Sequence, residues 1–577
     1  MFVDTDPEVI EPSDAVEVSA GTSAWRRSAF LLAAALLLVS ALALALRAPG
    51  LTASLPATQP DEPTVMSRAL LVLDGTMTPP AFDWPLGTSL VAAAAVRTGE
   101  ALGLTDRAGT VEEVYGLVRW VFMLIGVLVV AVTGLLAAAL VHRREGAPPR
   151  TDARAAAGPG HRPPAWLVAV AAGGGAGIVA VDFVMVRLAR MIQPDHLQVL
   201  FVLLALLAVV AAERAAAARP RLGGWLVAGA LAGVAGGMKY IGITVAVVPA
   251  VSALTSADLP LPRRVLTGLG IGVAAAVGFV VSTGGTVLSS AFVDGFVEQV
   301  LHQSGGHLGY DNEGPTWVHH LVVTIPGSVG WPVALAMIAA TGWSLWRGDR
   351  VRRLVAGYAV LLYAIVGLSR IVFPHYVIIV VPVLAALTGA ALADLVGGFA
   401  GARDERLRWG AVALLACAVL ALVPPALDGV RLLRSGAAPD TREGLVEELG
   451  DVLDRAGLAG VEVWTESYTG LGPDDVAGTG GALVFGFGDT PDILDCGCVV
   501  LVSSYQEERY AADAITGAVY TQLRERGTVL HERTPGVSLT YRWDLLPPWG
   551  IGAIPLTGDV PALGPSVTVL DLTGSGR

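Results

Sequence analysis

Long apolar runs alternate with short polar segments from residue 28 to residue 428. An apolar helix of about 18 residues or more can cross the roughly 30 Å hydrocarbon core of a bilayer. The pattern therefore predicts a polytopic α-helical membrane protein with about eleven transmembrane helices. These are expected at 28–46, 118–141, 165–182, 197–212, 225–238, 241–254, 265–283, 318–342, 354–369, 376–395 and 409–428.

The charges of the connecting loops provide a test of this layout. Every second loop is rich in arginine, whereas the loops between them hold acidic residues and histidines. Because cytoplasmic loops are enriched in Lys and Arg, the alternation predicts a cytoplasmic N-terminus and an extracytoplasmic C-terminal region. The arginines are Arg143, Arg144, Arg150, Arg154 and Arg162; Arg214, Arg219 and Arg221; Arg263 and Arg264; Arg347, Arg350, Arg352 and Arg353; and Arg403, Arg406 and Arg408.

Two neighbouring runs, 225–238 and 241–254, are short for this role. At 1.5 Å per residue each would reach only about 21 Å, less than the thickness of the hydrocarbon core. They form either a broken pair or one long tilted helix. A single helix would invert the orientation of every later segment, and the downstream arginine-rich loops argue against it.

The polar regions divide the remainder of the chain. We expect residues 1–24, which are acidic, to form a disordered cytoplasmic tail, and residues 25–430 to form the membrane module. The long outer loop 47–117 contains two short helical segments, at 66–73 and 86–96, which we expect to lie in the membrane interface.

Charged residues become frequent after residue 430, and long apolar runs stop. Asp440 to Glu443 resembles a capping box that opens a helix ending near Gly457, and a second helix is expected over 506–525. We expect a small extracytoplasmic α/β domain over 431–577, with strands at 461–464, 482–485, 499–502 and 567–570.

Composition supports a membrane protein. Of the 577 residues, 54% are hydrophobic and 15% are charged, and the mean hydropathy is +0.62. No basic helix or aromatic–basic stripe points to a nucleic-acid partner. Neither a GxGxxG nor a GxxxxGK[ST] motif points to a nucleotide site. Three cysteines are too few for a disulfide framework, and the spacing of Cys496 and Cys498 leaves open whether they pair.

Acidic residues at the expected outer face are the first candidates for chemistry. Asp61 and Glu62 are adjacent, and a carboxylate there could take the proton of an acceptor hydroxyl. The alternative is a solvated acidic pair with no chemical role. Asp195, at the outer start of an apolar run, is either a helix N-cap or a functional acid beside an anion-binding helix terminus.

Cations gather at the same face, where the positive-inside rule predicts few. Lys239 is the only lysine of the chain, and Arg119, Arg370 and His375 accompany it. Singly, each is explained by snorkelling or interfacial anchoring. Together they suggest an anionic ligand such as a lipid phosphate.

Histidines are a further set of candidates. His196 and His307 could contact an acceptor or, with other outer histidines, bind a divalent metal ion. No spacing such as HExxH supports a metal site, and no cofactor is required by the sequence. The other histidines in question are His302, His319 and His320.

A series of short motifs runs through nearly the whole chain, from about residue 25 to residue 572. Their order and shared outer face resemble the C-type glycosyltransferase superfamily, in the branch of protein O-mannosyltransferases and related polyprenyl-phosphate-sugar-dependent transferases. The motifs are Arg47-Ala48-Pro49-Gly50-Leu51, Pro60-Asp61-Glu62, the Gly75 to Pro85 run, Arg119, Pro194-Asp195, the Ala232 to Tyr240 segment, Phe373-Pro374-His375-Tyr376 with Pro382, and Gly564 to Val569.

The resemblance implies a role for each matching residue. Asp61 would be the general base, Glu62 would assist it, and Asp195 would be the second acidic group. Arg119 and Lys239 would bind the donor phosphate. The family's arginine before the tyrosine is replaced here by His375, whose charge depends on pH, so that Arg370 could substitute for it.

The implied reaction is a single displacement with inversion. A sugar, mannose or another hexose, would pass from a polyprenyl-phosphate donor to an acceptor hydroxyl on a protein, a polysaccharide or a glycolipid. The main alternative is a transporter or flippase for lipid-linked sugars, although no internal duplication supports it. A membrane anchor that displays the outer domain would not need eleven spans.

Overall fold

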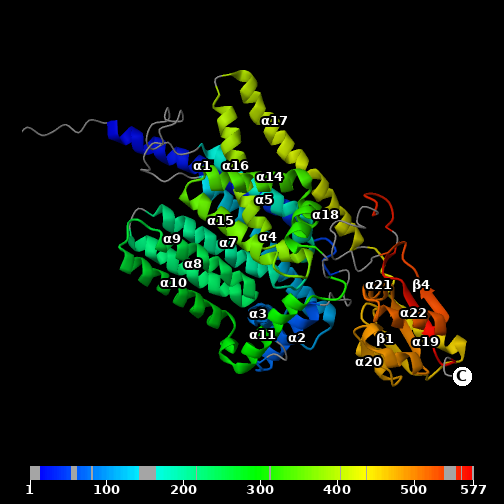
Figure 1. Cartoon of the computed structure of the whole chain (residues 1–577). Helices are drawn as coiled ribbons and strands as arrows, with labels where there is room; N and C mark the ends of the chain where they lie inside the picture. The colour runs from blue at the N-terminus through cyan, green and yellow to red at the C-terminus, as the bar shows by residue number, and fades with distance from the viewer. Residues whose placement is uncertain are drawn as a thin grey trace, which may run out of the picture.

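In the computed structural model, the structure describes residues 13–52, 61–78, 82, 84–141, 164–215, 218–310, 314–402, 404–436, 438–538, 554–560 and 562–574. The helical bundle is followed by a small α/β domain (Figure 1). Each of the eleven apolar runs falls on helical structure. The arginine-rich segment 142–163 and Arg403 lie outside the described residues.

The first half of the bundle comprises α1 (Ser13–Ala45), α2 (Asp61–Leu73), α3 (Gly87–Ala101), α4 (Val111–Val141), α5 (Ala165–Val181), α6 (Phe183–Leu188), α7 (Asp195–Arg214), α8 (Ala218–Met238), η1 (Tyr240–Ala246), α9 (Val247–Leu254) and α10 (Leu261–Ser282). The second half comprises η2 (Thr286–Leu288), α11 (Ser290–Gly305), α12 (Thr316–His319), η3 (His320–Thr324), α13 (Ile325–Val329), α14 (Trp331–Arg347), α15 (Arg350–Val366), η4 (Pro374–Val377), α16 (Val381–Ala400), α17 (Glu405–Ala421) and α18 (Val423–Ser435).

Length and composition separate the helices that can cross a membrane alone from those that cannot. Within the described residues, six helices qualify, and a seventh does if the pair Thr316–Val329 and Trp331–Arg347, bent by 119°, is one span. The six are 28–45, 111–141, 195–214, 261–282, 381–400 and 405–435. The protein is therefore a helical membrane protein, and the count of eleven spans stays a prediction.

The two short runs form a hairpin rather than one tilted helix. Lys239, in extended conformation, ends α8, and the chain returns as η1 and α9. The Arg221 guanidinium near the start of α8 lies 2.5 Å from the Asp258 carboxylate beyond α9, and Trp225 donates to the Ser252 hydroxyl at 2.9 Å. The interpretation as a pair of separate elements is confirmed.

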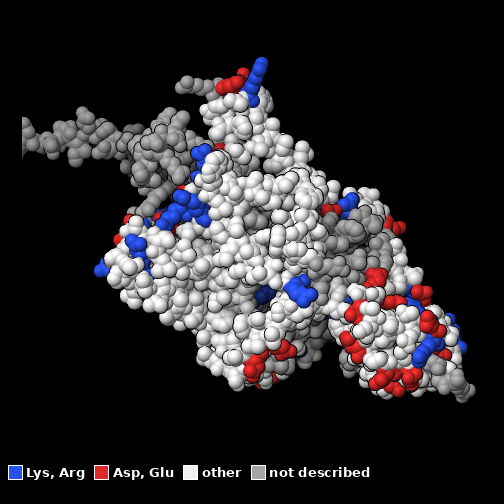
Figure 2. Space-filling view, in the orientation of Figure 1, with Lys and Arg blue, Asp and Glu red and all other residues white. Residues whose placement is uncertain are grey.

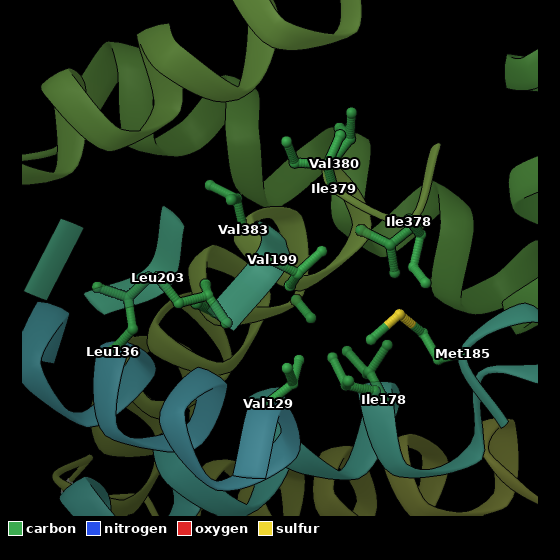
Figure 3. Packing of buried hydrophobic residues seen from close by; sticks show 14 of the residues in the cluster. Val129, Leu136, Ile178, Met185, Val199, Leu203, Ile378, Ile379, Val380 and Val383 are labelled. Atoms are coloured by element: carbon green, nitrogen blue, oxygen red, sulfur yellow. The ribbon is translucent and has the colours of Figure 1, made fainter. Parts of the chain in front are cut away.

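Apolar packing holds the bundle together. Side chains of α4, α5, α6 and α7 interdigitate with those of the segment that leads into α16 (Figure 3). Small residues allow the closest approach of helices: a Cβ added at Gly233 of α8 would lie 1.9 Å from the carbonyl oxygen of Ala275 in α10. The glycine-rich segment before Lys239 is thereby explained by packing.

Much of the bundle's surface is apolar. One face shows few charged side chains over the helices, whereas the C-terminal domain carries both signs (Figure 2). On α10 large apolar side chains point outward at intervals of about one turn, as expected for contact with lipid. They are Val265, Leu266, Leu269, Val273, Val277 and Val281.

The C-terminal domain contains a five-stranded sheet of order β2-β1-β3-β7-β4, in which β2, β1 and β3 are parallel and β7 is antiparallel to both of its neighbours. Its elements are α19 (Leu445–Ala456), β1 (Val463–Glu466), α20 (Pro473–Ala477), β2 (Leu483–Val484), η5 (Phe487–Asp489), η6 (Pro491–Asp495), β3 (Val499–Ser503), α21 (Ser504–Tyr510), α22 (Gly517–Arg526), β4 (Thr528–Arg533), β5 (Val537–Ser538), β6 (Leu563–Gly564) and β7 (Val567–Asp571).

Both faces of the sheet are covered. Successive residues of β3 point to opposite faces: Val499 and Leu501 pack with α19, whereas Val500 and Val502 pack with α22. A strand buried on both sides is expected to be largely apolar, and four of the five residues of β3 are valine or leucine. The predicted α/β domain is observed.

Several sequence-based expectations need correction. Residues 13–24 form the first turns of α1, and residues 1–12 lie outside the described residues. The helix expected from Asp440 begins at Leu445, since Asp440 instead pairs with Arg442 at 2.6 Å. Cys496 and Cys498, whose pairing the sequence left open, form a disulfide.

The helix expected over 506–525 is also wrong, because it is divided into α21 and α22. The Asp513 carboxylate accepts hydrogen bonds from the backbone N–H groups of Ile515 and Thr516, both at 2.9 Å, which replaces helical bonding locally. Strand β4 was not expected at all.

Candidate active site

The two adjacent carboxylates at the start of α2 point in different directions. Successive residues of a helix are about 100° apart around its axis, so Asp61 and Glu62 cannot share one face. Asp61 is half-buried, and its Oδ2 accepts a hydrogen bond from Gln193 Nε2 at 3.0 Å. Glu62 is buried and faces α4. Asp61 and Glu62 therefore belong to two separate sites.

Glu62 and Arg119 form a closed ion pair. Arg119 donates through Nε and Nη2 to the two oxygens of Glu62, at 2.8 and 2.6 Å, and through Nη1 to the Leu51 carbonyl. The Ile192 N–H also donates to Glu62, at 3.1 Å. The side chains are 0% and 2% exposed. This geometry suits a structural ion pair that fixes α2 to α4. It suits less well the predicted roles, in which Glu62 assists the base and Arg119 binds the donor phosphate.

Asp195 and Lys239 form a second pair at the same end of the bundle. Lys239 Nζ lies 2.9 Å from Asp195 Oδ1, and the lysine side chain is 16% exposed. The Gln198 amide donates to the Lys239 carbonyl at 3.3 Å, which fixes the turn after α8. Asp195 is the first residue of α7 rather than its N-cap, which is Pro194.

Asp61 and His375 lie close enough to interact electrostatically with this pair, Asp61 with Lys239 and His375 with Asp195. Lys239 Nζ also lies 5.4 Å from the centre of the Tyr376 ring, a cation–π distance. The structure thus brings together Asp61, Asp195, Lys239 and His375, which are far apart in sequence.

The other candidates have different surroundings. Arg370 is exposed, and its backbone N–H donates to the Gln303 carbonyl at 3.4 Å. His196 is buried inside the bundle against Gly126. His307 lies at the C-terminal domain, with its Nε2 2.8 Å from Arg509 Nη2. No cluster of three or more His, Cys, Asp or Glu side chains able to hold a metal ion occurs in the described part of the chain.

Neutral residues complete the site, and sequence reasoning missed most of them. Gln193 orients the Asp61 carboxylate without neutralising it. Tyr376 accepts a hydrogen bond from Gln303 Nε2 at 2.9 Å. The Tyr240 hydroxyl donates to the Phe82 carbonyl at 2.8 Å and connects the segment between α2 and α3 to the end of α8. The signal for Gln193 was its position directly before Pro194-Asp195.

The arrangement supports transfer of a group that leaves as an anion. A carboxylate positioned by an amide can accept a proton. An ammonium group a short distance away can stabilise negative charge that develops on a leaving phosphate. The rings of Phe373 and His375, stacked with centres 5.0 Å apart, flank this end of the bundle.

No protein-family model and no curated protein matches the chain. Solved structures resemble it distantly. ArnT from Cupriavidus metallidurans bound to undecaprenyl phosphate has 18% identity and a TM-score of 0.45, covering 74% of this chain and 73% of that chain. The Archaeoglobus fulgidus oligosaccharyltransferase has 12% identity and a TM-score of 0.47, covering 86% and 71%.

The S. cerevisiae protein O-mannosyltransferase Pmt1-Pmt2 complex bound to the sugar donor has 16% identity and a TM-score of 0.30, covering 47% of this chain and 33% of that chain. At these values the likeness is remote, and the roles of individual residues rest on the site itself.

Proposed function

We propose that the protein is a membrane glycosyltransferase that moves a hexose from a polyprenyl-phosphate donor to an acceptor hydroxyl. The observation that carries the proposal is the convergence of Asp61 with the Asp195–Lys239 pair at the end of the bundle where α2 and α3 lie. Alternating arginine-rich loops support placing this end outside the membrane, with the N-terminus in the cytoplasm.

The reaction is a single displacement. The acceptor oxygen attacks the anomeric carbon, Asp61 takes the hydroxyl proton, and the bond from that carbon to the phosphate oxygen breaks with inversion. Lys239 stabilises the polyprenyl phosphate as it leaves. Asp195 holds the ammonium in place at 2.9 Å. No nucleotide takes part.

The exposure and the hydrogen bond of Asp61 support its assignment as the base. Asp61 is half-buried, and its carboxylate accepts a hydrogen bond from Gln193 Nε2 at 3.0 Å. His375, beside Asp195, provides a second contact for phosphate when it is protonated. The acceptor, whether protein, polysaccharide or glycolipid, is left open by these residues.

Transfer assays in liposomes test the proposal. Purified protein is given radiolabelled polyprenyl-phosphate-mannose, other polyprenyl-phosphate hexoses, and GDP-mannose as a water-soluble comparison, with cell-envelope acceptors. We expect label to pass from a polyprenyl phosphate to an acceptor with inverted anomeric configuration, as read by NMR. Movement of lipid-linked sugar across the bilayer, with no transfer from any donor, would instead establish the transporter.

A further inference from the structure

One contact of the C-terminal domain with the bundle is made by a short segment, 307–310, which lies between α11 and α12. Leu308 packs against the hydrophobic cluster of the domain that includes Phe487 and Tyr510. Arg509 of α21 lies over the Tyr310 ring, 5.2 Å from its centre. Residues 307–310 of the membrane module thus pack against the C-terminal domain.

Polar contacts fix this segment. Arg509, 4% exposed, donates through Nε to the Leu308 carbonyl at 3.1 Å and through Nη2 to His307 Nε2 at 2.8 Å. Because a guanidinium has no acceptor atom, His307 must accept through an unprotonated Nε2. The hydroxyls of Tyr310 and Tyr505 lie 2.6 Å apart, and the Tyr505 ring stacks on Tyr468.

The same segment is bonded to the loop that carries His375 and Tyr376. The Val372 N–H donates to the Tyr310 carbonyl at 3.0 Å, and the Tyr310 and Phe373 rings have centres 4.5 Å apart. Phe373 in turn stacks on His375. The contact with the outer domain therefore continues into the candidate active site.

A parallel connection runs through Gln303, at the end of α11. Its amide nitrogen donates to the Tyr376 hydroxyl, and its amide oxygen accepts from the Ser369 hydroxyl, both at 2.9 Å. Both ends of the 369–376 loop are thus bonded to residues 303–310. Tyr376 is the residue whose ring lies beside Lys239.

We propose that Arg509 and Tyr505 of the C-terminal domain are positioning residues for the donor side of the site. They hold segment 307–310, which sets the place of the loop bearing His375 and Tyr376 beside Lys239. The inference rests on the proposed function, since that function assigns Lys239 to the donor phosphate. It gives the outer domain a part in catalysis that is distinct from selection of the acceptor.

The test compares Arg509→Ala and Tyr505→Phe with Arg526→Ala as a matched control. Arg526 belongs to the same domain, but it pairs with Asp495 at 3.1 Å, and both of those side chains are largely exposed. Tyr505→Phe keeps the ring and removes the hydroxyl contact, so it tests the proposal even if Arg509→Ala fails to fold. Each full-length variant is assayed with donor and acceptor varied separately.

We expect Arg509→Ala to lower kcat/KM for the polyprenyl-phosphate sugar by about ten- to a hundredfold, since small displacements of catalytic groups have effects of this order. Tyr505→Phe is expected to have a smaller effect in the same direction, and acceptor KM is expected to stay at the wild-type value. Loss of folded protein would lower the apparent kcat and leave both KM values unchanged, whereas displacement of the donor side of the site should raise the donor KM. A raised acceptor KM with unchanged donor parameters would overturn the proposal in favour of acceptor selection.

Hydrogen exchange provides a reading that does not depend on turnover. With Arg509→Ala, peptides covering 369–377 should exchange faster than in the wild type or in Arg526→Ala, and added decaprenyl phosphate should protect them less. Wild-type exchange in this region would overturn the inference, even if transfer is observed. If the wild type transfers no sugar, the proposed function fails, while the exchange data still decide whether the domain positions this loop.

Discussion

Two ion pairs lie near the start of α2 and the start of α7, and they differ in how completely their side chains are buried. Glu62–Arg119 has side chains that are 0% and 2% exposed and two short bonds between the partners. Asp195–Lys239 has a contact of 2.9 Å between Nζ and Oδ1, a lysine that is 16% exposed, and Asp61 nearby. A closed pair, in which both side chains are fully buried and bonded to each other, stabilises the fold. An open pair, in which one side chain is partly exposed, can exchange its partner for a ligand.

The largest expected effect comes from breaking the closed pair. Arg119→Ala would leave Glu62 buried without its cation, which typically costs about 3–5 kcal/mol of stability. Denaturant or thermal unfolding in detergent measures it. Arg370→Ala, at an exposed arginine, is the control and should change stability by no more than about 0.5 kcal/mol.

A different result would reverse the comparison. If Arg119→Ala has the stability of the wild type but loses transfer, then Arg119 faces the donor, as the sequence motif implied. The Glu62–Arg119 pair would then not be a structural contact between α2 and α4.

The open pair should respond in the opposite way. Lys239→Met removes the ammonium that faces the leaving phosphate, so transfer should fall by about 10²–10³-fold, the usual effect of losing one electrostatic contact in a transition state. Its stability loss should be smaller than that of Arg119→Ala because the site is already partly open. The measurements are kcat/KM for the donor and the unfolding midpoint. Unchanged activity per folded molecule would remove Lys239 from the site.

Another buried carboxylate, Glu466 at the end of β1, extends the comparison to the C-terminal domain. Burial raises the pKa of Glu466 from 4.5 to about 8, against hydrogen bonds from the Tyr520 hydroxyl at 2.5 Å and the Ser503 N–H at 2.7 Å. The folded protein therefore keeps a proton that the unfolded chain releases near pH 4.5. Stability should fall as the pH rises between these values, by up to about 1.4 kcal/mol per unit.

The matched variant is Glu466→Gln, which stays neutral at every pH and should flatten this slope. Unfolding of the full-length protein between pH 5 and 8, followed by exchange in β1 and β3 peptides, measures it. The same slope in both proteins would show that another group is responsible.

The smallest expected effect is at Gln193, which orients Asp61. Gln193→Ala should lower kcat by about tenfold, because a hydrogen bond to a charged group is worth about 1.5–3 kcal/mol and water replaces part of it. Donor KM should not change. Steady-state kinetics with varied donor measures both parameters, and a raised KM alone would place Gln193 in donor binding.

The local pattern of apolar and polar residues was sufficient to predict much of the fold. Apolar runs located the helices, and β-branched runs located β1, β2, β3 and β7. It missed β4, whose sequence from Thr528 to Arg533 is polar and half-exposed, and it joined α21 to α22 because the turn at Asp513 depends on a side-chain contact.

The site was predictable where a residue type conflicts with its surroundings, as for Lys239 next to apolar sequence or Asp195 at a helix start. The sequence could not predict that Asp61 faces the site while Glu62 pairs with Arg119, since this depends on the rotation of α2 relative to α4. The contact of Arg509 with His307 joins residues 202 positions apart, and no local pattern marks it.

The central claim is that Asp61 is the catalytic base. It is tested most directly by transfer from radiolabelled polyprenyl-phosphate-mannose, comparing the wild type with Asp61→Asn at matched folding and dispersity. We predict transfer by the wild type and a loss of about a hundredfold or more in the variant, because general-base catalysis typically contributes 10²–10⁴-fold. Equal transfer by both proteins would contradict the assignment of Asp61.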